Sequence, residues 1–335
     1  MTKLFSQRSV NLSLYRYAVQ GEISSVTVSD NGMTTIKFDT QEEIPTSCVN
    51  CEETYCIKIP IATGVFDDLN SSQKAKLCPT DAIAPNEHGR LEVDQSSCIS
   101  CGLCIARCPV QAISFKKNDV SVIYNDCSIE EGDVKYSLAD SINHNKSSQY
   151  IEESKGLFQT IFSQIEQSES PYRTLNNLVS KAMQISGIEN VLSRQGDVNL
   201  RMDAIGLYKG KYVLCEIEKA TNLDAPRDIL DDVAVFCSRY DISKDNVIGM
   251  IVVPSMPNRR TEFWELLSDI YNVTGLQIAV VPLAAILIAV WNEKKISLEQ
   301  FFLNQNKMSA REAVEGMLGR AINLPDPCDL LEPEK

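Results

Sequence analysis

The sequence predicts two domains of different fold class: a small α+β module rich in cysteine, followed by a larger α/β domain with a central mixed sheet. Eight of the twelve cysteines lie between residues 48 and 108. From residue 151 onward, the spacing of apolar residues alternates between helix and strand periodicity. At 335 residues, the chain is also longer than one domain usually is. We therefore expect domains over residues 1–118 and 151–335, the second ending in a helical tail.

The first domain begins with a predicted β-hairpin. Residues 26–38 alternate on either side of Asp30-Asn31-Gly32, which is typical of a tight turn between antiparallel strands. This strand pair leads into the cysteines. Residues 119–150 are rich in Asn, Ser, Asp and Glu and have little apolar periodicity, so they are expected to form a linker.

The cysteines fall into two ordered sets. One reads Cys98-x2-Cys101-x2-Cys104-x3-Cys108-Pro109, and the other reads Cys48-x2-Cys51-x4-Cys56, with Cys78-Pro79 after 21 further residues. Each Cys-Pro pair opens the same internal repeat, Cys-Pro-x-x-Ala-Ile. A spacing of two lets successive turns of a loop aim three thiolates at three irons of one cluster, and the fourth ligand then comes from elsewhere. The pattern predicts a pair of iron–sulfur clusters.

On these motifs, residues about 44–116 resemble a bacterial-type two-[4Fe–4S] ferredoxin. The crossed ligation of that family implies one cluster on Cys98, Cys101, Cys104 and Cys78, and a second on Cys48, Cys51, Cys56 and Cys108. The second set departs from the family pattern, because four residues instead of two precede Cys56 and an insertion precedes Cys78. These departures bear on the redox behaviour of the second cluster.

Zinc and disulfides are the two alternatives to clusters for these cysteines. Cys-x2-Cys pairs also build structural zinc sites, but four thiolates per site and two Cys-Pro ends favour clusters. Disulfides are disfavoured, because the N-terminal residues Met1 to Phe5 lack the apolar core of a signal peptide. We therefore expect a reducing cytoplasm as the compartment.

Charge and hydropathy limit the partners. The net charge of −13 does not favour binding to a polyanion. The longest apolar stretch, residues 276–291, contains Gln277 and Pro282 and is shorter than the roughly 20 residues of a transmembrane helix. It is expected to form a buried strand followed by a helical turn, and no membrane partner is expected.

The second domain has the predicted element order α-β-β-β-α-β-α-β. Helices are expected at 172–186, about 225–240 and 259–272. Extended segments are expected at 191–193, 198–208, 212–217, 247–254 and 276–281.

The most informative local feature of this domain is a hairpin at Lys209-Gly210. If these two residues form the turn, Asp203 lies opposite Glu216 on one face of the sheet. Both faces of the hairpin are otherwise apolar, so the two carboxylates are expected to be buried. Like charges directly opposite on a sheet are destabilising, and one carboxylate must take up a proton unless a cation lies between them. A divalent metal with oxygen ligands removes this difficulty.

Two neighbouring residues extend the candidate site. Glu218 falls on the same face as Glu216, and Lys219 falls on the other, because strand side chains alternate. An alternative role for Glu218 is that of a cross-strand partner for Arg201. The alternative for Asp203 and Glu216 is a pair at the sheet edge that faces water or a nearby arginine.

The segment from Leu175 to Lys219 is similar to the core of the PD-(D/E)xK (restriction-endonuclease-like) nuclease superfamily, and the resemblance covers about 165–290. It implies that Asp203 and Glu216 are metal ligands, with Glu218 and Lys219 as further catalytic residues. Met202 stands where the family has proline, and Glu218 stands where it usually has the catalytic lysine. Gln195 precedes the hairpin and is expected to lie within reach of the site.

This resemblance implies Mg²⁺- or Mn²⁺-dependent hydrolysis of phosphodiester bonds in DNA, in restriction, repair or defence, with the clusters in a structural or redox-control role. The alternative is an electron-transfer or redox-sensing protein whose C-terminal domain is a non-catalytic binding module. A third class is an accessory subunit with a helicase, modification or redox partner.

Residues 151–335 carry 19 basic against 26 acidic residues, a net charge of −7. Contacts to DNA would therefore need locally gathered cations, from among Arg173, Lys181, Arg194, Arg201, Lys209, Lys211, Arg259 and Arg260.

Overall fold

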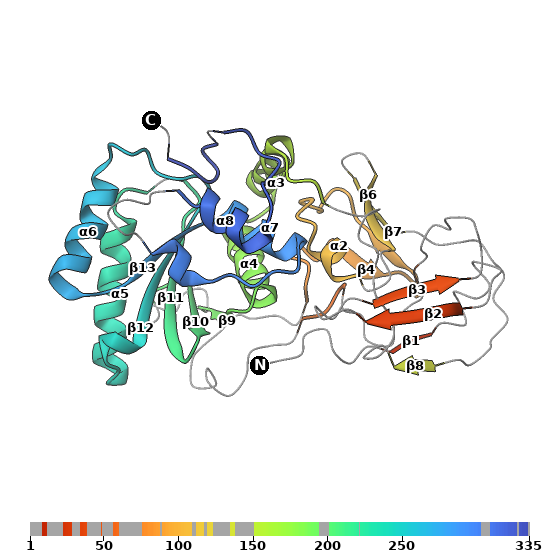
Figure 1. Cartoon of the computed structure of the whole chain (residues 1–335), viewed down its shortest axis with the longest axis horizontal. Coiled ribbons are helices and arrows are strands. Elements are labelled where there is room, and N and C mark those ends of the chain that lie inside the picture. Colours follow the sequence, from red (N-terminus) through yellow and green to blue (C-terminus); the bar gives the residue numbers. More distant parts are fainter. Residues whose placement is uncertain are drawn as a thin grey trace. The chain divides into compact units, whose positions relative to one another are not determined.

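A computed structural model describes most of the cysteine-rich core and nearly all of the second domain (Figure 1). The described residues are 9–11, 23–28, 34–38, 48, 56–59, 76–87, 89–108, 112–116, 119–122, 135–137, 151–193, 201–220, 222–302, 309–326 and 328–333. The molecule divides into two compact units, residues 1–59 with 76–151 and residues 60–75 with 152–335. Each unit is described by itself.

Short antiparallel strand pairs make up the sheets of the first unit. The predicted hairpin is confirmed, because β2 (Ile23–Val28) pairs with β3 (Thr34–Phe38). β1 (Ser9–Asn11) pairs with β8 (Lys135–Ser137), and β6 (Ile113–Lys116) pairs with β7 (Asp119–Val122). The expectation of a continuous linker over 119–150 is therefore wrong at β7 and β8. β8 pairs with a strand that is distant in the sequence, which local composition does not reveal.

The internal repeat is visible in the fold. β4 (Ile83–Pro85) and β6 begin at the isoleucines that end the two Cys-Pro-x-x-Ala-Ile segments, and β4 pairs with β5 (Leu91–Val93). Between the two segments lies the short helix α2 (Leu103–Arg107). The side chains that pack in this core are Leu77, Leu91, Leu103, Ala112, Ile113 and Val120.

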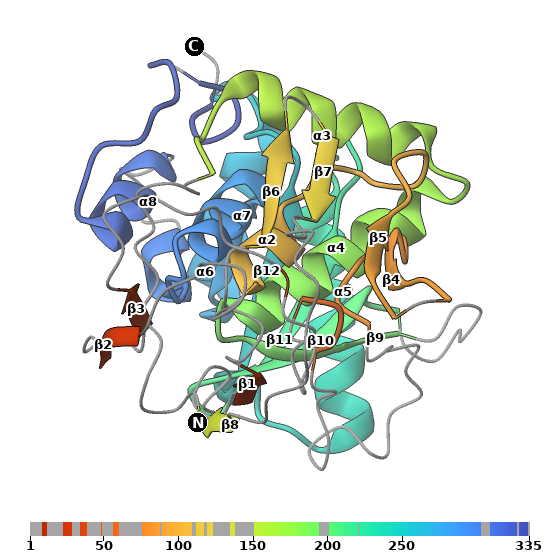
Figure 2. The same ribbon diagram turned by 90° about the vertical axis from the view of Figure 1, so that its right-hand side faces the viewer.

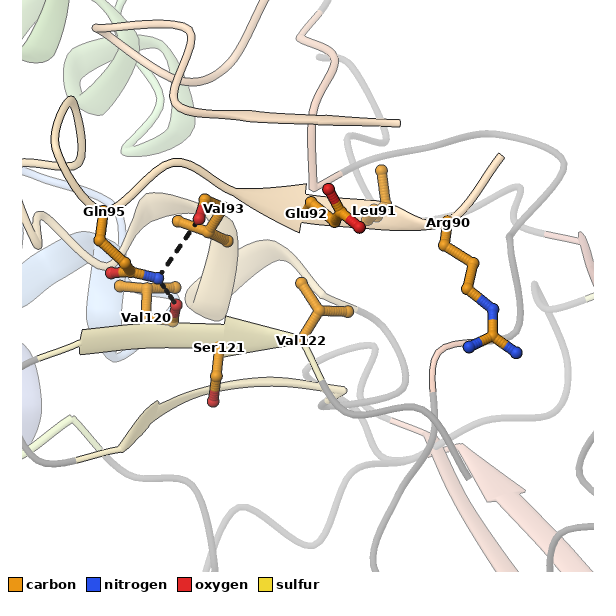
Figure 3. Close-up of a pocket in the computed structure, with 8 residues that line it drawn as sticks. All are labelled: Arg90, Leu91, Glu92, Val93, Gln95, Val120, Ser121 and Val122. Atoms are coloured by element: carbon orange, nitrogen blue, oxygen red, sulfur yellow. Dashed lines mark hydrogen bonds between the residues drawn. The ribbon is translucent and has the colours of Figure 1, made fainter. Parts of the chain in front are cut away.

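A cavity of about 360 Å³ lies between β5 and β7 (Figure 3). At one end, the side-chain amide of Gln95 donates to the carbonyl oxygens of Val120, at 2.7 Å, and Val93, at 3.4 Å. Gln95 thus links the two hairpins of the cluster core.

The second unit is built on a five-stranded mixed sheet, as the sequence predicts. Its order is β13-β12-β11-β10-β9, and β12 to β9 follow one another from left to right in Figure 2. β9, β10 and β11 form an antiparallel meander, and β12 and β13 join it in parallel. The strands are β9 (Glu189–Leu192), β10 (Ala204–Tyr208), β11 (Lys211–Ile217), β12 (Val247–Val253) and β13 (Ile278–Pro282).

The β10–β11 hairpin has the predicted register. Lys209 and Gly210 both have positive φ, 49° and 80°, as a two-residue turn of this kind requires. Ile205 faces Leu214, and Tyr208 faces Lys211. The register is defined because a shift of one residue would move every side chain to the other face of the sheet.

Helices cover both faces of this sheet (Figure 1). α5 and α6 contribute Ile229, Phe236, Phe263 and Leu267 to the core on one face. α4 contacts β9 and β11, and α3 and α7 both pack against α4. The helices are α3 (Lys155–Gln167), α4 (Pro171–Ile185), α5 (Ala225–Tyr240), α6 (Glu262–Thr274), α7 (Leu283–Trp291) and α8 (Arg311–Leu318), with 3₁₀ turns at Lys244–Asn246 and Leu298–Phe301.

The predicted helices are present, and so are the predicted strands, although the one expected at 198–208 begins at Ala204 and residues 198–200 lie outside the described residues. α8 lies within the region expected to be a helical tail, and α3 is a further helix that the apolar pattern did not indicate. The expected helical turn after β13 is the nine-residue helix α7, all of whose residues are buried. Among the described residues, no helix combines the length and the apolar character that are needed to cross a membrane.

A buried ion pair ties the end of the chain to the rest of the second unit. The side chain of Glu153, which is 0% exposed, accepts from Arg320 at 2.5 Å and from the amide of Asn292 at 3.2 Å. Arg320 also donates to the side-chain oxygen of Asn292, at 3.1 Å. The three side chains come from the segment before α3, the end of α7 and the segment after α8.

Candidate functional site

Four of the predicted cluster ligands line one cavity in the first unit: Cys78, Cys98, Cys101 and Cys104. The backbone of the loop that carries three of them explains how this is possible. Ser100 and Gly102 have left-handed φ of 54° and 73°, so the backbone turns on both sides of Cys101. α2 then begins at Leu103 and presents Cys104 from its first turn.

The two Cys-Pro segments hold their sulfur atoms in the same way. The backbone N–H of Ala82 donates to the sulfur of Cys78 at 3.2 Å, and that of Ala112 donates to the sulfur of Cys108 at 3.3 Å. In each half of the repeat, the N–H donor lies four residues after the cysteine whose sulfur accepts the hydrogen bond. A backbone N–H at this distance is a donor of the kind that a metal-bound cysteine sulfur accepts.

Burial raises the pKa of the Cys98, Cys101 and Cys104 thiols, and the proximity of other cysteines, Cys78 among them, raises each pKa further. Bound metal cations would favour the thiolate forms of Cys98, Cys101 and Cys104 over the thiols. In a [4Fe–4S] cluster each thiolate binds a different iron, so the sulfur atoms surround a volume and do not converge on a point. The four thiols that line this cavity match the ligand set of such a group.

The second predicted set is described in part. Cys56 and Cys108 are buried, and Cys48 is half-buried. Cys56 lies close enough to Cys104 to raise the pKa of that thiol. Cys51 lies outside the described residues, so the second ligand set stays a prediction. No disulfide joins the cysteines that the structure describes.

The second unit brings the predicted carboxylates together at the start of β10 and the end of β11. One oxygen of Asp203 accepts from the backbone N–H of Ile217 and the other from the amide of Asn176, both at 2.9 Å. These bonds orient the carboxylate. Burial nevertheless raises the pKa of Asp203, and the charge of Asp232 adds to this effect.

Asp232 of α5 is a member of this site that the sequence pattern did not reveal. It is 3% exposed and lies beside Glu216, to which it is joined by a hydrogen bond between the two carboxyl groups. Burial, this bond and the charges of nearby acids raise the pKa of Glu216 to about 10. Glu216 therefore holds the shared proton at neutral pH. The signal that could have found Asp232 is an acidic residue on the apolar face of α5, between Ile229 and Phe236.

Glu218 and Lys219 follow β11 and point to different partners. Glu218 accepts from the amide of Asn222 at 3.0 Å, and burial raises its pKa. Lys219 pairs with Glu166 of α3 at 2.8 Å and lies over the ring of Tyr172. Lys219 is therefore directed away from the carboxylates, as its position on the other strand face predicts.

The alternative in which Arg201 pairs with Glu218 is wrong. Arg201 lies 3.7 Å from Asp232 and 4.0 Å from Asp231 instead. Other cations expected to contact DNA are also engaged elsewhere, because Lys181 is buried and Lys209 pairs with Glu299 at 2.7 Å. Gln195 and Arg194 lie outside the described residues.

The carboxylates do not form a ready-made cation site. Throughout the described ranges, no three His, Cys, Asp or Glu side chains are arranged to hold a single metal ion. Both oxygens of Asp203 already accept hydrogen bonds, and Glu216 shares a proton with Asp232. Mg²⁺ or Mn²⁺ would first have to displace that proton.

The protonated state of Glu216 predicts how stability depends on pH. In the unfolded chain Glu216 titrates near pH 4.3, so between there and pH 10 the folded chain binds one more proton and loses stability as the pH rises. Glu216→Gln keeps a hydrogen-bond donor and removes this loss. We expect the variant to be more stable than the wild type by roughly 1–2 kcal/mol at pH 8, after allowance for solvent screening.

Urea unfolding at pH 8 and at pH 4, in the presence of a chelator, measures the effect. Most of the advantage of the variant should disappear at pH 4, because there the glutamate is fully protonated in the folded chain and mostly protonated in the unfolded chain. An equal difference at the two pH values would contradict the assigned protonation.

Comparison with known proteins identifies the class of the first unit. The 4Fe–4S binding domain family matches residues 91–114. The protein therefore contains a 4Fe–4S domain and binds an iron–sulfur cofactor. The thiosulfate reductase electron transfer subunit PhsB of Salmonella typhi is 30% identical over 91 residues, which cover 27% of this chain and 35% of the relative. A polysulfide reductase polypeptide of Wolinella succinogenes is 36% identical over 66 residues, covering 20% of this chain and 25% of the relative.

A third relative, a ferredoxin of Pyrobaculum islandicum, is 43% identical over 42 residues, covering 12% of this chain and 39% of the relative. The matched segments thus span well under half the length of each of these relatives. A solved structure of restriction endonuclease FokI aligns with 49% of this chain and 34% of its own, at 14% identity and a TM-score of 0.33. A score this low supports no argument about the second unit.

Proposed function

We propose that this protein is an electron-transfer protein that holds two [4Fe–4S] clusters and exchanges electrons with a partner protein. The observation that carries the proposal is the cavity lined by four cysteines, together with the matching N–H···S hydrogen bonds in both halves of the repeat. The relatives named as an electron transfer subunit and a ferredoxin support the same role.

In this proposal Cys78, Cys98, Cys101 and Cys104 hold one cluster, and Cys48, Cys51, Cys56 and Cys108 hold the other. Each cluster supplies one-electron chemistry when bound. The N–H groups of Ala82 and Ala112 stabilise negative charge on the sulfur atoms. Buried apolar residues around the thiols, such as Leu77 and Leu103, limit the access of water. The second unit then serves as a binding module for a redox partner or another ligand.

The proposal is tested on the full chain, reconstituted anaerobically with iron and sulfide. About eight irons and eight sulfides per chain are expected, with a visible absorption that is bleached by dithionite and restored by a one-electron acceptor. Zinc in place of iron, or a bound cluster that cannot be reduced and reoxidised, would contradict electron transfer.

A second candidate function is metal-dependent hydrolysis of phosphodiester bonds. It is favoured by one observation: Asp203, Glu216 and Glu218 gather at the end of the β10–β11 hairpin, as the nuclease resemblance implies. The engaged Lys219 and the shared proton on Glu216 count against a preformed site. The clusters would then have a structural or redox-control role.

Anaerobic incubation with plasmid and linear DNA, with Mg²⁺ or Mn²⁺, tests this candidate. If the site is active, Asp203→Asn should abolish cleavage and leave the iron content unchanged. Asp245→Asn is the matched control, because Asp245 is an exposed acid of the same unit. Cleavage by Asp203→Asn at the wild-type rate, or no cleavage by the wild type with either metal, would rule the candidate out.

A further inference from the structure

The sulfur of Cys78 has a second hydrogen-bond partner besides the backbone N–H of Ala82. The hydroxyl oxygen of Thr80 lies 3.6 Å from this sulfur, which is close enough for a hydrogen bond to the large sulfur atom. Within the described ranges, Cys78 is the hydrogen-bond partner of the Thr80 side chain. The contact therefore involves one of the four cysteines that line the cluster cavity.

A tight turn after Cys78 brings this hydroxyl into place. Pro79 has a fixed φ, Asp81 has a left-handed φ of 60°, and the backbone N–H of Asp81 donates to the carbonyl of Cys78 at 3.4 Å. The chain thus folds back towards Cys78, and both the hydroxyl of Thr80 and the N–H of Ala82 approach its sulfur. The same turn therefore positions the cysteine and its two partners.

Cluster binding fixes the direction of the hydrogen bond between Thr80 and Cys78. Between a thiol and a hydroxyl, either group can donate. A cysteine sulfur that binds iron is a thiolate, and a thiolate has no proton to donate. With a cluster bound, the Thr80 hydroxyl is the donor, and the sulfur accepts from this hydroxyl and from the N–H of Ala82.

The other half of the internal repeat has no hydroxyl at the equivalent position. Thr80 is the second residue after Cys78, and Val110 is the second residue after Cys108. Valine is branched at the same atom as threonine but carries a methyl group where threonine carries its hydroxyl. The repeat itself thus indicates the substitution that removes the donor and keeps the shape of the side chain.

We propose that the Thr80 hydroxyl raises the reduction potential of the cluster on the four cysteines that line the cavity. Reduction takes one electron from an external donor and makes the cluster and its sulfur ligands more negative. A hydrogen bond becomes stronger as its acceptor becomes more negative, so the donor stabilises the reduced state more than the oxidised state. Thr80 acts only through the sulfur of Cys78. This inference rests on the proposed electron transfer and assigns a residue that sets its potential.

The test is a redox titration of the reconstituted full chain, followed by electron paramagnetic resonance, with iron and sulfide counted in each sample. Thr80→Val removes the hydroxyl, and Thr80→Ser retains it. Ser121→Ala is the matched control, because it removes a half-buried hydroxyl of β7 that lines the cavity between β5 and β7.

Thr80→Val should keep its iron and shift one midpoint potential to more negative values. We expect the ratio of reduced to oxidised cluster at a given potential to fall about three- to tenfold, because the reduced state loses a hydrogen bond to a charged acceptor. For a one-electron couple, this change is a shift of roughly 30–60 mV. Thr80→Ser and Ser121→Ala should stay near the wild-type potentials.

Unchanged potentials in a fully loaded Thr80→Val variant would overturn the role of Thr80 alone. An equal shift in Thr80→Ser or in Ser121→Ala would also overturn it, because the contact between this hydroxyl and the sulfur would not be the cause. Loss of iron from Thr80→Val would overturn it as well, because the residue would then be needed for assembly. A wild type whose bound iron cannot be reduced would instead overturn the proposed function, and this inference with it.

Discussion

Replacement of Cys101 by alanine is expected to remove at least half of the iron of the reconstituted chain. Cys101 is buried and lines the cavity together with Cys78, Cys98 and Cys104. Without its thiolate, one iron of the cluster lacks a protein ligand, and no other described cysteine lines that cavity. Because the free energy of cluster binding also stabilises the fold around it, the first unit should become less stable. Iron and sulfide analysis and the visible absorption measure the loss.

Cys237→Ala provides the control for this experiment. Cys237 is a half-buried cysteine of α5 in the second unit, outside both ligand sets. This variant should keep the full iron content. A Cys101→Ala variant with wild-type iron and sulfide would show that this thiol is not a ligand.

Replacement of Arg320 by methionine should destabilise the second unit by about 2–3 kcal/mol. The change leaves the carboxylate of Glu153, which is 0% exposed, without the guanidinium that donates to both of its oxygens. Breaking a fully buried ion pair costs about 3–5 kcal/mol. Because the side chain of Arg320 is 38% exposed, water screens part of the interaction, and the expected loss of stability is at or below the lower end of that range. Urea unfolding, followed through the tryptophans Trp264 and Trp291 of this unit, measures the change.

Two further variants separate the buried charge from other effects. Glu153→Gln combined with Arg320→Met removes both charges and should recover most of the lost stability. Lys244→Met breaks an exposed ion pair with Asp245 and should change stability by less than about 1 kcal/mol. A loss in Arg320→Met no larger than in Lys244→Met would contradict the role of the buried pair.

The regular elements of the second unit could be predicted because they follow local rules. Gly210 next to Lys209 indicated a two-residue turn, and the turn set the pairing of Ile205 with Leu214. The apolar period of α4 and the continuous apolar strand β12 were equally direct. The cysteine spacings likewise predicted an iron–sulfur module, and the match of the 4Fe–4S family to residues 91–114 bears this out.

Elements that depend on distant partners were missed or misjudged. β8 exists through its pairing with β1, more than 120 residues earlier in the chain, and its own composition is that of a linker. Asp232 joins the carboxylates only because α5 packs on β11. Neither contact leaves a periodic trace in the sequence.

By itself, the sequence indicated a cluster motif in the cysteines and the position of the hairpin turn, and it predicted that Asp203, Glu216 and Glu218 share a face. Only the tertiary structure decided the charge states and partners of these groups. It directs Lys219 to Glu166, joins Glu216 to Asp232 through a proton, and buries Arg107 where the other half of the repeat buries Leu77. The physical reason is that turns and periodicity are local properties of the backbone. Burial and charge pairing instead depend on which distant side chains the fold brings together.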